Sequence, residues 1–498
     1  MTLGKYVMFR MSSSTHTSTS ERWQLTGVLA LPLLLLGCAT RPPQVLTPKI
    51  LPEVFTVGAA ATAPVWPQAD WWQPFGSPEL SDLITEARAG NLDLAAAAAR
   101  VTEARAQRGI QSSALFPHID AQAQAQHIAP SSLGSSNGCS SVCNSFGLSA
   151  GASYIVDLRG VVRSNVRAAS ESLKSARFAQ QAVALTITAN VANTYFNVLA
   201  LRRRTDIANE NIDAINGILD VIKLRVSAGT SSHLDLAQEE AQLEAVAASR
   251  SLLKQAEHAA RVELAVLLGR PPERFEVQAQ NLNGLVPPPV GPGLPSDLLL
   301  RRPDIAQAEA DLASAHANLD AARSAFLPQF ALTADGGFTS TAIGILLRSP
   351  SFAWDYGGTL VQTLFDGGQL VHQKSLATAT QEELVAKYRS AVINAYADVE
   401  NALDEVATNS EAENHLKREV EAAREAFAIA QLQYRQGATS LLNVLQAQQT
   451  LFSAEDELTQ LNLAHLQASV HLFEALGGGW MEDPRERTQF TKAIRDTR

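Results

Sequence analysis

Ile119-Asp120-Ala121-Gln122-Ala123-Gln124-Ala125-Gln126 alternates strictly between apolar and polar side chains. A period of two residues is typical of a β-strand whose two faces meet different environments. Three later segments show the same alternation, so we predict strands at 117–128, 146–157, 328–340 and 351–365. Each has an apolar face, aromatic in most of them, and a face of small and polar residues. The segments are close to the ~9–11 residues of a tilted membrane-spanning strand.

Four such strands cannot close on themselves in a membrane. Beyond residue 37 the sequence has no run of about 18 apolar residues that could form a spanning helix. Open sheet edges would leave backbone groups unpaired in lipid, so a sheet that crosses a membrane must close into a barrel. Three copies of the chain would supply twelve strands. A soluble sheet packed on the helices is the alternative interpretation.

Long helices with a coiled-coil seam accompany the strands. In 184–226, apolar or small residues recur at unbroken spacings of three and four, which is the heptad pattern. The positions are Ala184, Ile187, Val191, Thr194, Val198, Leu201, Thr205, Ala208, Ile212, Ile215, Leu219, Ile222 and Val226. A helix over 161–226 would be about 100 Å long at ~1.5 Å per residue. A plain coiled-coil rod would show the same periodicity, and the strands are what argues against it.

The chain repeats this plan in its second half. The seam register continues over 392–434, where Asn409 and Glu413 interrupt it. A shorter seam follows each long helix. The first comprises Leu236, Glu239, Leu243, Val246, Arg250, Leu253, Glu257, Ala260, Leu264 and Leu267, and the second comprises Val444, Ala447, Leu451, Ala454, Leu458, Leu461, His465, Ala468, Leu472 and Ala475. Because the order helix, strand, strand, long helix, turn and helix occurs twice, we infer an internal duplication.

Composition shifts divide the chain into six segments. They are a leader at 1–37, a Pro-rich segment at 38–80, a first repeat at 81–270, a Pro-rich connector at 271–295, a second repeat at 296–478 and a charged tail at 479–498. Proline excludes regular helix from the connector. The predicted helices of the repeats are 161–226, 232–268, 368–435 and 440–476.

The leader ends in a lipoprotein box. Basic residues precede an apolar run that closes on Leu35-Leu36-Gly37-Cys38, and either Met1 or Met11 can be the start. This arrangement is typical of a secretory signal that is removed before a cysteine. We predict N-acyl and S-diacylglycerol lipid on Cys38, and an outer-membrane destination because Ala39 follows it. An ordinary signal peptide with an incidental cysteine is the alternative.

The net charge and the cysteines indicate which partners and which thiol chemistry to expect. The formal net charge is −10 and no basic stripe is present, so we expect no nucleic-acid partner. Cys139 and Cys143 lie in a polar stretch of a chain predicted to be exported, where a disulfide and two free thiols are both open interpretations.

No constellation in the sequence indicates catalysis or metal binding. Ser231, His233 and Asp235 have the residue types of a hydrolase triad, but triad members meet through the fold and not within five residues. The histidines show no metal-binding pair at helical spacing. The glycines at 477–479 lack the Lys-Ser/Thr of a phosphate-binding loop and suit a helix end. We therefore predict no enzyme, no metal site and no cofactor other than the lipid.

The motif Arg301-Arg302-Pro303-Asp304, within 294–309, resembles the hallmark sequence of the outer-membrane efflux factors. These are TolC-like channels, and the lipoprotein leader places the resemblance in their NodT-like branch. The likeness extends over about 64–476. In the motif itself, Ser296 can cap a helix whose buried face begins at 298–300, and Pro303 restricts the residue before it. We therefore interpret the motif as architectural.

The resemblance implies an α+β membrane protein that works as a homotrimeric outer-membrane efflux duct. Four strands per protomer would form a 12-stranded β-barrel that continues into a long periplasmic α-helical barrel. The implied partners are two further copies of the chain, a periplasmic adaptor (membrane fusion) protein, an inner-membrane RND-type transporter and outer-membrane lipid. The implied function is passive conduction of substrates that this transporter delivers.

The resemblance also implies that the turns between paired helices close the periplasmic tip. Gly229 and Gly437 suit left-handed helix ends in these turns. Thr439 lies in the second turn. Relatives often carry carboxylates just after this turn, where this chain has the neutral Asn443 and Gln446. We hypothesise that Asp235 and Tyr434 latch the tip. Equally, Asp235 can serve the helix dipole and Tyr434 the seam.

Two other functions compete with this one. A structural coiled-coil outer-membrane lipoprotein without a pore would have the same helices and leader. A general diffusion porin is disfavoured, because porins lack long helices and place many more strands in one chain.

Overall fold

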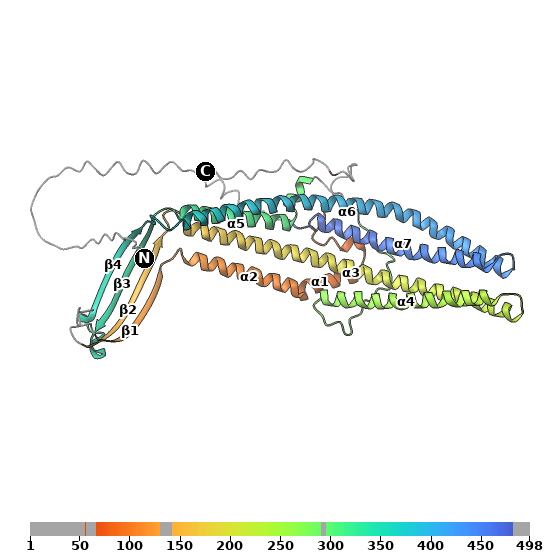
Figure 1. Cartoon of the computed structure of the whole chain (residues 1–498), viewed down its shortest axis with the longest axis horizontal. Coiled ribbons are helices and arrows are strands. Elements are labelled where there is room, and N and C mark those ends of the chain that lie inside the picture. Colours follow the sequence, from red (N-terminus) through yellow and green to blue (C-terminus); the bar gives the residue numbers. More distant parts are fainter. Residues whose placement is uncertain (1–54, 56–65, 130–141, 290–294, 482–498) are drawn as a thin grey trace, which may run out of the picture. The chain divides into compact units, whose positions relative to one another are not determined.

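The computed structural model describes residues 55, 66–129, 142–289 and 295–481. Within them, helices α1 (Pro78–Gly90) and α2 (Leu92–Ser113) precede strands β1 (His118–Ile128) and β2 (Cys143–Val156). Helices α3 (Val161–Ser227), α4 (His233–Leu267) and α5 (Pro303–Ser324) follow, then strands β3 (Gln329–Ser340) and β4 (Phe352–Val361), and helices α6 (Gln369–Arg435) and α7 (Leu441–Ala475). Figure 1 shows the four strands side by side, beyond the ends of the helices that lead into them. No helix in these ranges is long and apolar enough to cross a membrane.

The two halves of the chain coincide element by element. The bounds of α2 and α5 differ by 211 residues at both ends, and those of α3 and α6, and of α4 and α7, differ by 208. The first half has the extra helix α1, where the second half has only the short 3-10 turn Pro295–Leu300. The boundary expected between residues 80 and 81 thus falls inside α1. Ser77 accepts a hydrogen bond from the Leu80 amide and Pro78 occupies the first turn, which is why a helix begins here.

The two long helices begin in the same way. Gly160 and Gly368 precede them in the left-handed region, at φ of 80° and 92°. A carboxylate before each glycine then accepts amide hydrogen bonds from the first turn, Asp157 from Arg163 at 2.9 Å and Asp366 from Leu370 at 2.9 Å. This arrangement turns the chain sharply from strand to helix at equivalent places in both repeats.

The seams predicted for the long helices are largely buried. Their buried members are Ile187, Val191, Thr194, Val198, Leu201, Ala208, Ile215, Leu219, Ile222, Val392, Ala395, Val399, Ala402, Val420, Ala423 and Tyr434. The interruption at Glu413 has a partner on α7, because the His465 Nδ1 atom lies 2.9 Å from the Glu413 carboxylate. At Glu413 the interruption of the apolar pattern is therefore matched by a polar residue on the neighbouring helix.

The strands form one antiparallel sheet in the order β1-β2-β3-β4. The register places Ile119 opposite Ala152, Ala152 opposite Ala334, and Ala334 opposite Tyr356. These residues belong to the apolar faces predicted from the alternation, so all four apolar faces lie on the same side of the sheet. All residues of β4 are exposed, so none of the described helices covers that strand.

The fourth strand is shorter than the predicted 351–365. It ends at Val361, which pairs with Gln329, the first residue of β3. Beyond this pair β4 has no partner for its backbone, and Leu364 and Phe365 are 93% and 90% exposed. In the sequence, apolar and polar side chains still alternate after Val361, but the hydrogen bonding between β3 and β4 ends there. The alternation alone therefore predicted too long a strand.

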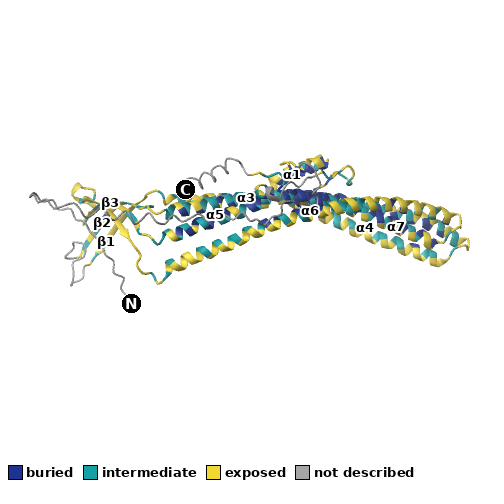
Figure 2. Cartoon of the chain, turned by 90° about the horizontal axis from the view of Figure 1, so that it is seen from above, coloured by how far each residue is buried: buried dark blue, intermediate teal, exposed yellow. Residues whose placement is uncertain are grey.

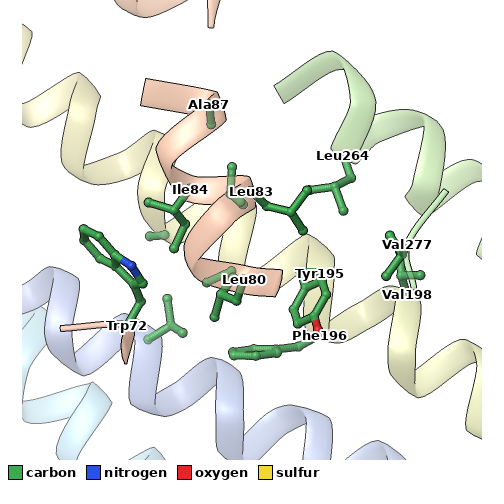
Figure 3. Packing of buried hydrophobic residues seen from close by; sticks show 14 of the residues in the cluster. Trp72, Leu80, Leu83, Ile84, Ala87, Tyr195, Phe196, Val198, Leu264 and Val277 are labelled. Atoms are coloured by element: carbon green, nitrogen blue, oxygen red, sulfur yellow. The ribbon is translucent and has the colours of Figure 1, made fainter. Parts of the chain in front are cut away.

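The main core lies where the two repeats meet. Trp71, Trp72 and Phe75, which precede α1, pack with α1, α3, α4 and the end of α7. Figure 3 shows Leu80 and Ile84 of α1 beside Tyr195 and Phe196 of α3. Figure 2 shows buried residues gathered along this stretch of α3 and α6. The Pro-rich segment at 38–80 thus contributes large aromatic side chains to the core.

The connector is held against this core by charged groups. The Glu79 carboxylate accepts hydrogen bonds from the amides of Gln278, at 2.6 Å, and Ala279, at 3.0 Å. The Arg202 guanidinium donates to the carbonyl oxygens of Val277 and Ala279 and to Glu257. The extended backbone of this connector therefore has its polar groups paired by side chains of α1 and α3.

The helix start expected near Ser296 was wrong. Helix α5 begins at Pro303, and its N-cap Arg302 has φ −112° and ψ 123°. The proline ring disfavours helical geometry at residue 302, so the residues before it cannot join α5. Leu298 is buried and Leu300 is 47% exposed in the preceding 3-10 turn. The motif is nevertheless architectural, as its contacts below show.

Candidate functional site at the helix turns

The turns α3–α4 and α6–α7 have the same backbone design. Gly229 and Gly437 adopt φ of 71° and 76°. In each turn the residue after the glycine donates its amide to a carbonyl five residues earlier, Thr230 to Arg225 and Ala438 to Gln433, both at 2.8 Å. These left-handed helix ends satisfy carbonyl groups that the helix would otherwise leave unpaired. The glycines have the role in the turns that the sequence predicted.

Asp235 completes a capping box at the start of α4. Its Oδ2 atom accepts hydrogen bonds from the Ser231 hydroxyl, at 2.7 Å, and the Ser232 amide, at 3.1 Å. The Ser232 hydroxyl in turn accepts from the Leu234 amide. A carboxylate at a helix N-terminus also interacts favourably with the helix dipole. Within one protomer, this is the helix-capping role and not a contact with Tyr434.

The second turn uses neutral groups instead. The Asn443 side-chain amide donates to the Thr439 hydroxyl at 2.8 Å. Ser440 stands at the N-cap of α7 without a side-chain capping bond. Gln446 is exposed one turn further along the helix. The two turns therefore share a backbone but differ in charge.

Tyr434 joins α6 to the end of α3. The Arg225 guanidinium donates to the backbone carbonyls of Tyr434, at 2.7 Å, and Arg435, at 3.1 Å. It also lies 4.5 Å from the centre of the Tyr434 ring, within the range of a cation–π contact. The sequence did not single out Arg225, although an arginine in the last turn of a helix is a known partner for terminal carbonyls.

The tip has a small apolar core of its own. It consists of Ile218 and Ile222 of α3, Tyr434 of α6, and Leu441 and Val444 of α7, with Leu236 of α4 beside them. Because all four helices contribute, the two hairpins are packed together at this level. The Arg225 guanidinium lies over this cluster and is hydrogen-bonded to backbone carbonyls of the second repeat.

Arg302 of the hallmark motif joins three helices away from the tip. It donates to Asp304 at 2.7 Å, to Asp398 of α6 at 3.0 Å and to the Ala475 carbonyl that ends α7 at 3.2 Å. In the first repeat Asn91 donates to the Leu267 carbonyl that ends α4, at 2.8 Å. Asn91 and Arg302 stand at equivalent N-caps, so the residue at this position tethers a helix end in each repeat.

The cysteines are the remaining predicted site residues. Cys38 and Cys139 lie outside the described residues. Cys143, at the start of β2, is disulfide-bonded. In the part of the chain that the structure describes, no group of His, Cys, Asp or Glu side chains is arranged to hold a metal ion.

Comparison with known proteins gives consistent matches along the chain. The family model for outer membrane efflux proteins matches residues 83–270 and 294–478. The pyoverdine export outer membrane protein OpmQ of Pseudomonas putida is 38% identical over 466 residues, covering 92% of this chain and 98% of the relative. OpmQ of Pseudomonas aeruginosa is 36% identical over 456 residues, covering 91% and 96%. The solved structure of the outer-membrane channel OprN superposes with a TM-score of 0.81 at 27% identity, covering 87% of this chain and 98% of that channel.

Proposed function

The chain belongs to the outer membrane efflux protein family, and from this we propose that it is the homotrimeric exit duct of a tripartite export system. The resemblance based on the Arg301–Asp304 motif is confirmed by the family match. The chain is an outer-membrane channel component that conducts substrates outwards. Its trimer would close a twelve-stranded barrel continued by a tube of helices. A periplasmic adaptor and an inner-membrane RND-type transporter would deliver the cargo, and lipid on Cys38 would reinforce attachment to the membrane.

The two unpaired edges of the sheet are the main support for a trimer. Strands β1 and β4 are its two edges, and each has an unpaired side. If β4 of one protomer pairs with β1 of the next, three copies remove every edge and close an even-numbered barrel, as single-chain bacterial barrels do. The long helices below the sheet would then come together in the same threefold arrangement.

The faces of the sheet indicate which side is wet. Asp120, Gly151, Asp335 and Asp355 lie directly opposite one another in one row across the four strands. Three carboxylates side by side repel each other and need water, so this face would line the channel. Trp354 and Tyr356 are stacked on the other face, with ring centres 5.8 Å apart, and would face lipid.

This row leads to a prediction about ion selectivity. We expect Asp120, Asp335 and Asp355 together to make the channel prefer cations, because three copies would place nine carboxylates at one level. Changing all three to asparagine is expected to move the reversal potential under a salt gradient towards zero. Asp82→Asn, at an exposed site on α1, serves as the control and is expected to leave it unchanged. An unchanged reversal potential in the triple variant would place the aspartates outside the pore.

The tip gives a second prediction. Arg225→Met removes charged hydrogen bonds to the second repeat that are worth roughly 1.5–3 kcal/mol each when well formed. We expect the two hairpins to separate more readily, seen as faster hydrogen exchange in 428–445 and a larger conductance. Arg435→Met is the control, since Arg435 lies in the last turn of α6, as Arg225 does in α3, and is exposed. Equal exchange in both variants would refute the role of Arg225.

The proposed duct is tested by purification and reconstitution. The full chain is expected to form a trimer that conducts ions in planar bilayers and to co-purify with an adaptor and a transporter. Deleting its gene should block export, and pyoverdine is the first cargo to assay because two relatives carry that name. A stable trimer without conductance would favour the alternative, a structural coiled-coil lipoprotein.

A further inference from the structure

A carboxylate is buried in the hairpin next to the first turn. Glu239 of α4 has 0% exposed surface. Between His233 and Ala259 it is the only buried residue of α4, although leucines occupy neighbouring seam positions. Neither of its carboxylate oxygens has a hydrogen-bond partner among the residues that the structure describes. The equivalent position in the second repeat is Ala447, which is small and neutral. The apolar seam of α4 is thus interrupted by an acid that nothing compensates.

No neighbouring charge accounts for Glu239. On the facing end of α3, Asp213, Asp220 and Lys223 are exposed, and Arg225 binds Tyr434. The sequence has no titratable side chain in residues 426–433 of α6 or 441–454 of α7. On α4 itself, Asp235 caps the helix, and His233, Glu240 and Glu244 are exposed. Glu239 is therefore held among uncharged groups.

An isolated buried carboxylate is stable in this position only when it carries a proton. Ionisation would place a charge in a site without water or a counter-ion, at a cost that normally shifts the group to its neutral form. From the complete burial of Glu239, its orphaned oxygens and its place two turns from Ser232, we propose that Glu239 is a proton-binding site that couples the packing of α4 on α3 to pH. That the surrounding pH is the periplasmic one rests on the proposed function.

The direction of the coupling follows from linkage. Burial raises the pKa of Glu239 from 4.5 to about 7. A carboxyl whose pKa is raised in the packed state favours packing fully below the unpacked pKa, and this advantage is lost as pH rises towards the packed value. Between these values the equilibrium for local opening should rise up to about tenfold per pH unit, and it should level off above the packed pKa. The hairpin is thus tightest in acid and loosest at mildly alkaline pH.

Hydrogen exchange of the full chain tests this without requiring conductance. After correction for chemical exchange rates, peptides covering 233–246 are expected to exchange at least about tenfold faster at pH 8 than at pH 5.5. Glu239→Gln should abolish the difference, because its side chain is neutral at both values. Glu240→Gln, at the exposed adjacent residue, should retain it. A pH-independent wild type, or a Glu239→Gln chain with the wild-type response, would overturn the proposal.

A second neutral variant tests the proposal if Glu239→Gln does not fold. Glu239→Leu places an apolar side chain in the same apolar surroundings, and we expect it to fold and to lose the pH response as well. If both neutral variants fail to fold at pH 5.5, the proposal is wrong, since it requires a neutral side chain there. A chain that shows the pH response but never conducts would refute the proposed duct and leave the proton site intact.

Discussion

Replacing Tyr356 by arginine is expected to prevent assembly of the protein in the outer membrane. Tyr356 lies in the middle of β4, 77% exposed, on the face that also carries Trp354. A charge on the lipid face of a barrel costs about 2–4 kcal/mol at the bilayer centre, and in a trimer the cost is incurred three times. We expect the amount of trimer in outer-membrane fractions, and with it export, to fall to the level of a deletion strain.

Asp355→Arg is the matched control for this variant. Asp355 is the preceding residue of the same strand, and it lies on the opposite face beside Asp335. The same arginine there would face water in the channel and is expected to permit assembly. If both variants assemble equally well, the assignment of the two faces, and with it the proposed barrel, is wrong.

Replacing Phe75 by alanine is expected to be the most damaging change in the helical part of the protein. Phe75 has 0% exposed surface. Its ring centre lies 5.4 Å from that of Phe196 in α3 and 6.1 Å from that of Phe473 in α7. Truncation of a buried phenylalanine costs about 3–5 kcal/mol, because a cavity remains where the ring was. We expect a clearly lower denaturant midpoint for loss of helical signal by circular dichroism.

Phe116→Ala makes the same chemical change at a site that is 69% exposed. It is expected to shift the midpoint much less than Phe75→Ala. Equal midpoints for the wild type and Phe75→Ala would show that the segment before α1 adds little to the core.

Periodicity along the chain was sufficient to predict the long helices and the strand faces. Spacings of three, four and two decide which side chains share a face before any tertiary contact forms. The seam from Ile187 to Ile222 and the apolar faces of the strands could therefore be predicted. The ends of elements could not, because β4 stops where β3 has no further residue to pair with, and α5 starts where Pro303 permits.

The candidate site was predictable only in part. The turn glycines were evident, since few other residues adopt a positive φ at a helix end. Arg225 was missed because its partners are carbonyls at Tyr434 and Arg435, more than 200 residues away in the chain. Glu239 appeared in the seam pattern, but the sequence does not show whether a counter-ion lies opposite. That Asp235 and Tyr434 help to latch the closed tip stays a hypothesis.

The sequence by itself determined that the chain has two homologous halves. Each half combines long heptad helices with a pair of strands that have one apolar and one polar face, and the chain resembles an efflux duct. These properties depend on the order and spacing of residues, which are local. Only the tertiary structure decided that the segment before α1 joins the core, that the carboxylates of the strands lie in one row, and that Glu239 has no hydrogen-bond partner in the described part of the chain. Each of these depends on which distant residues meet, and such meetings are set by packing and register, not by spacing along the chain.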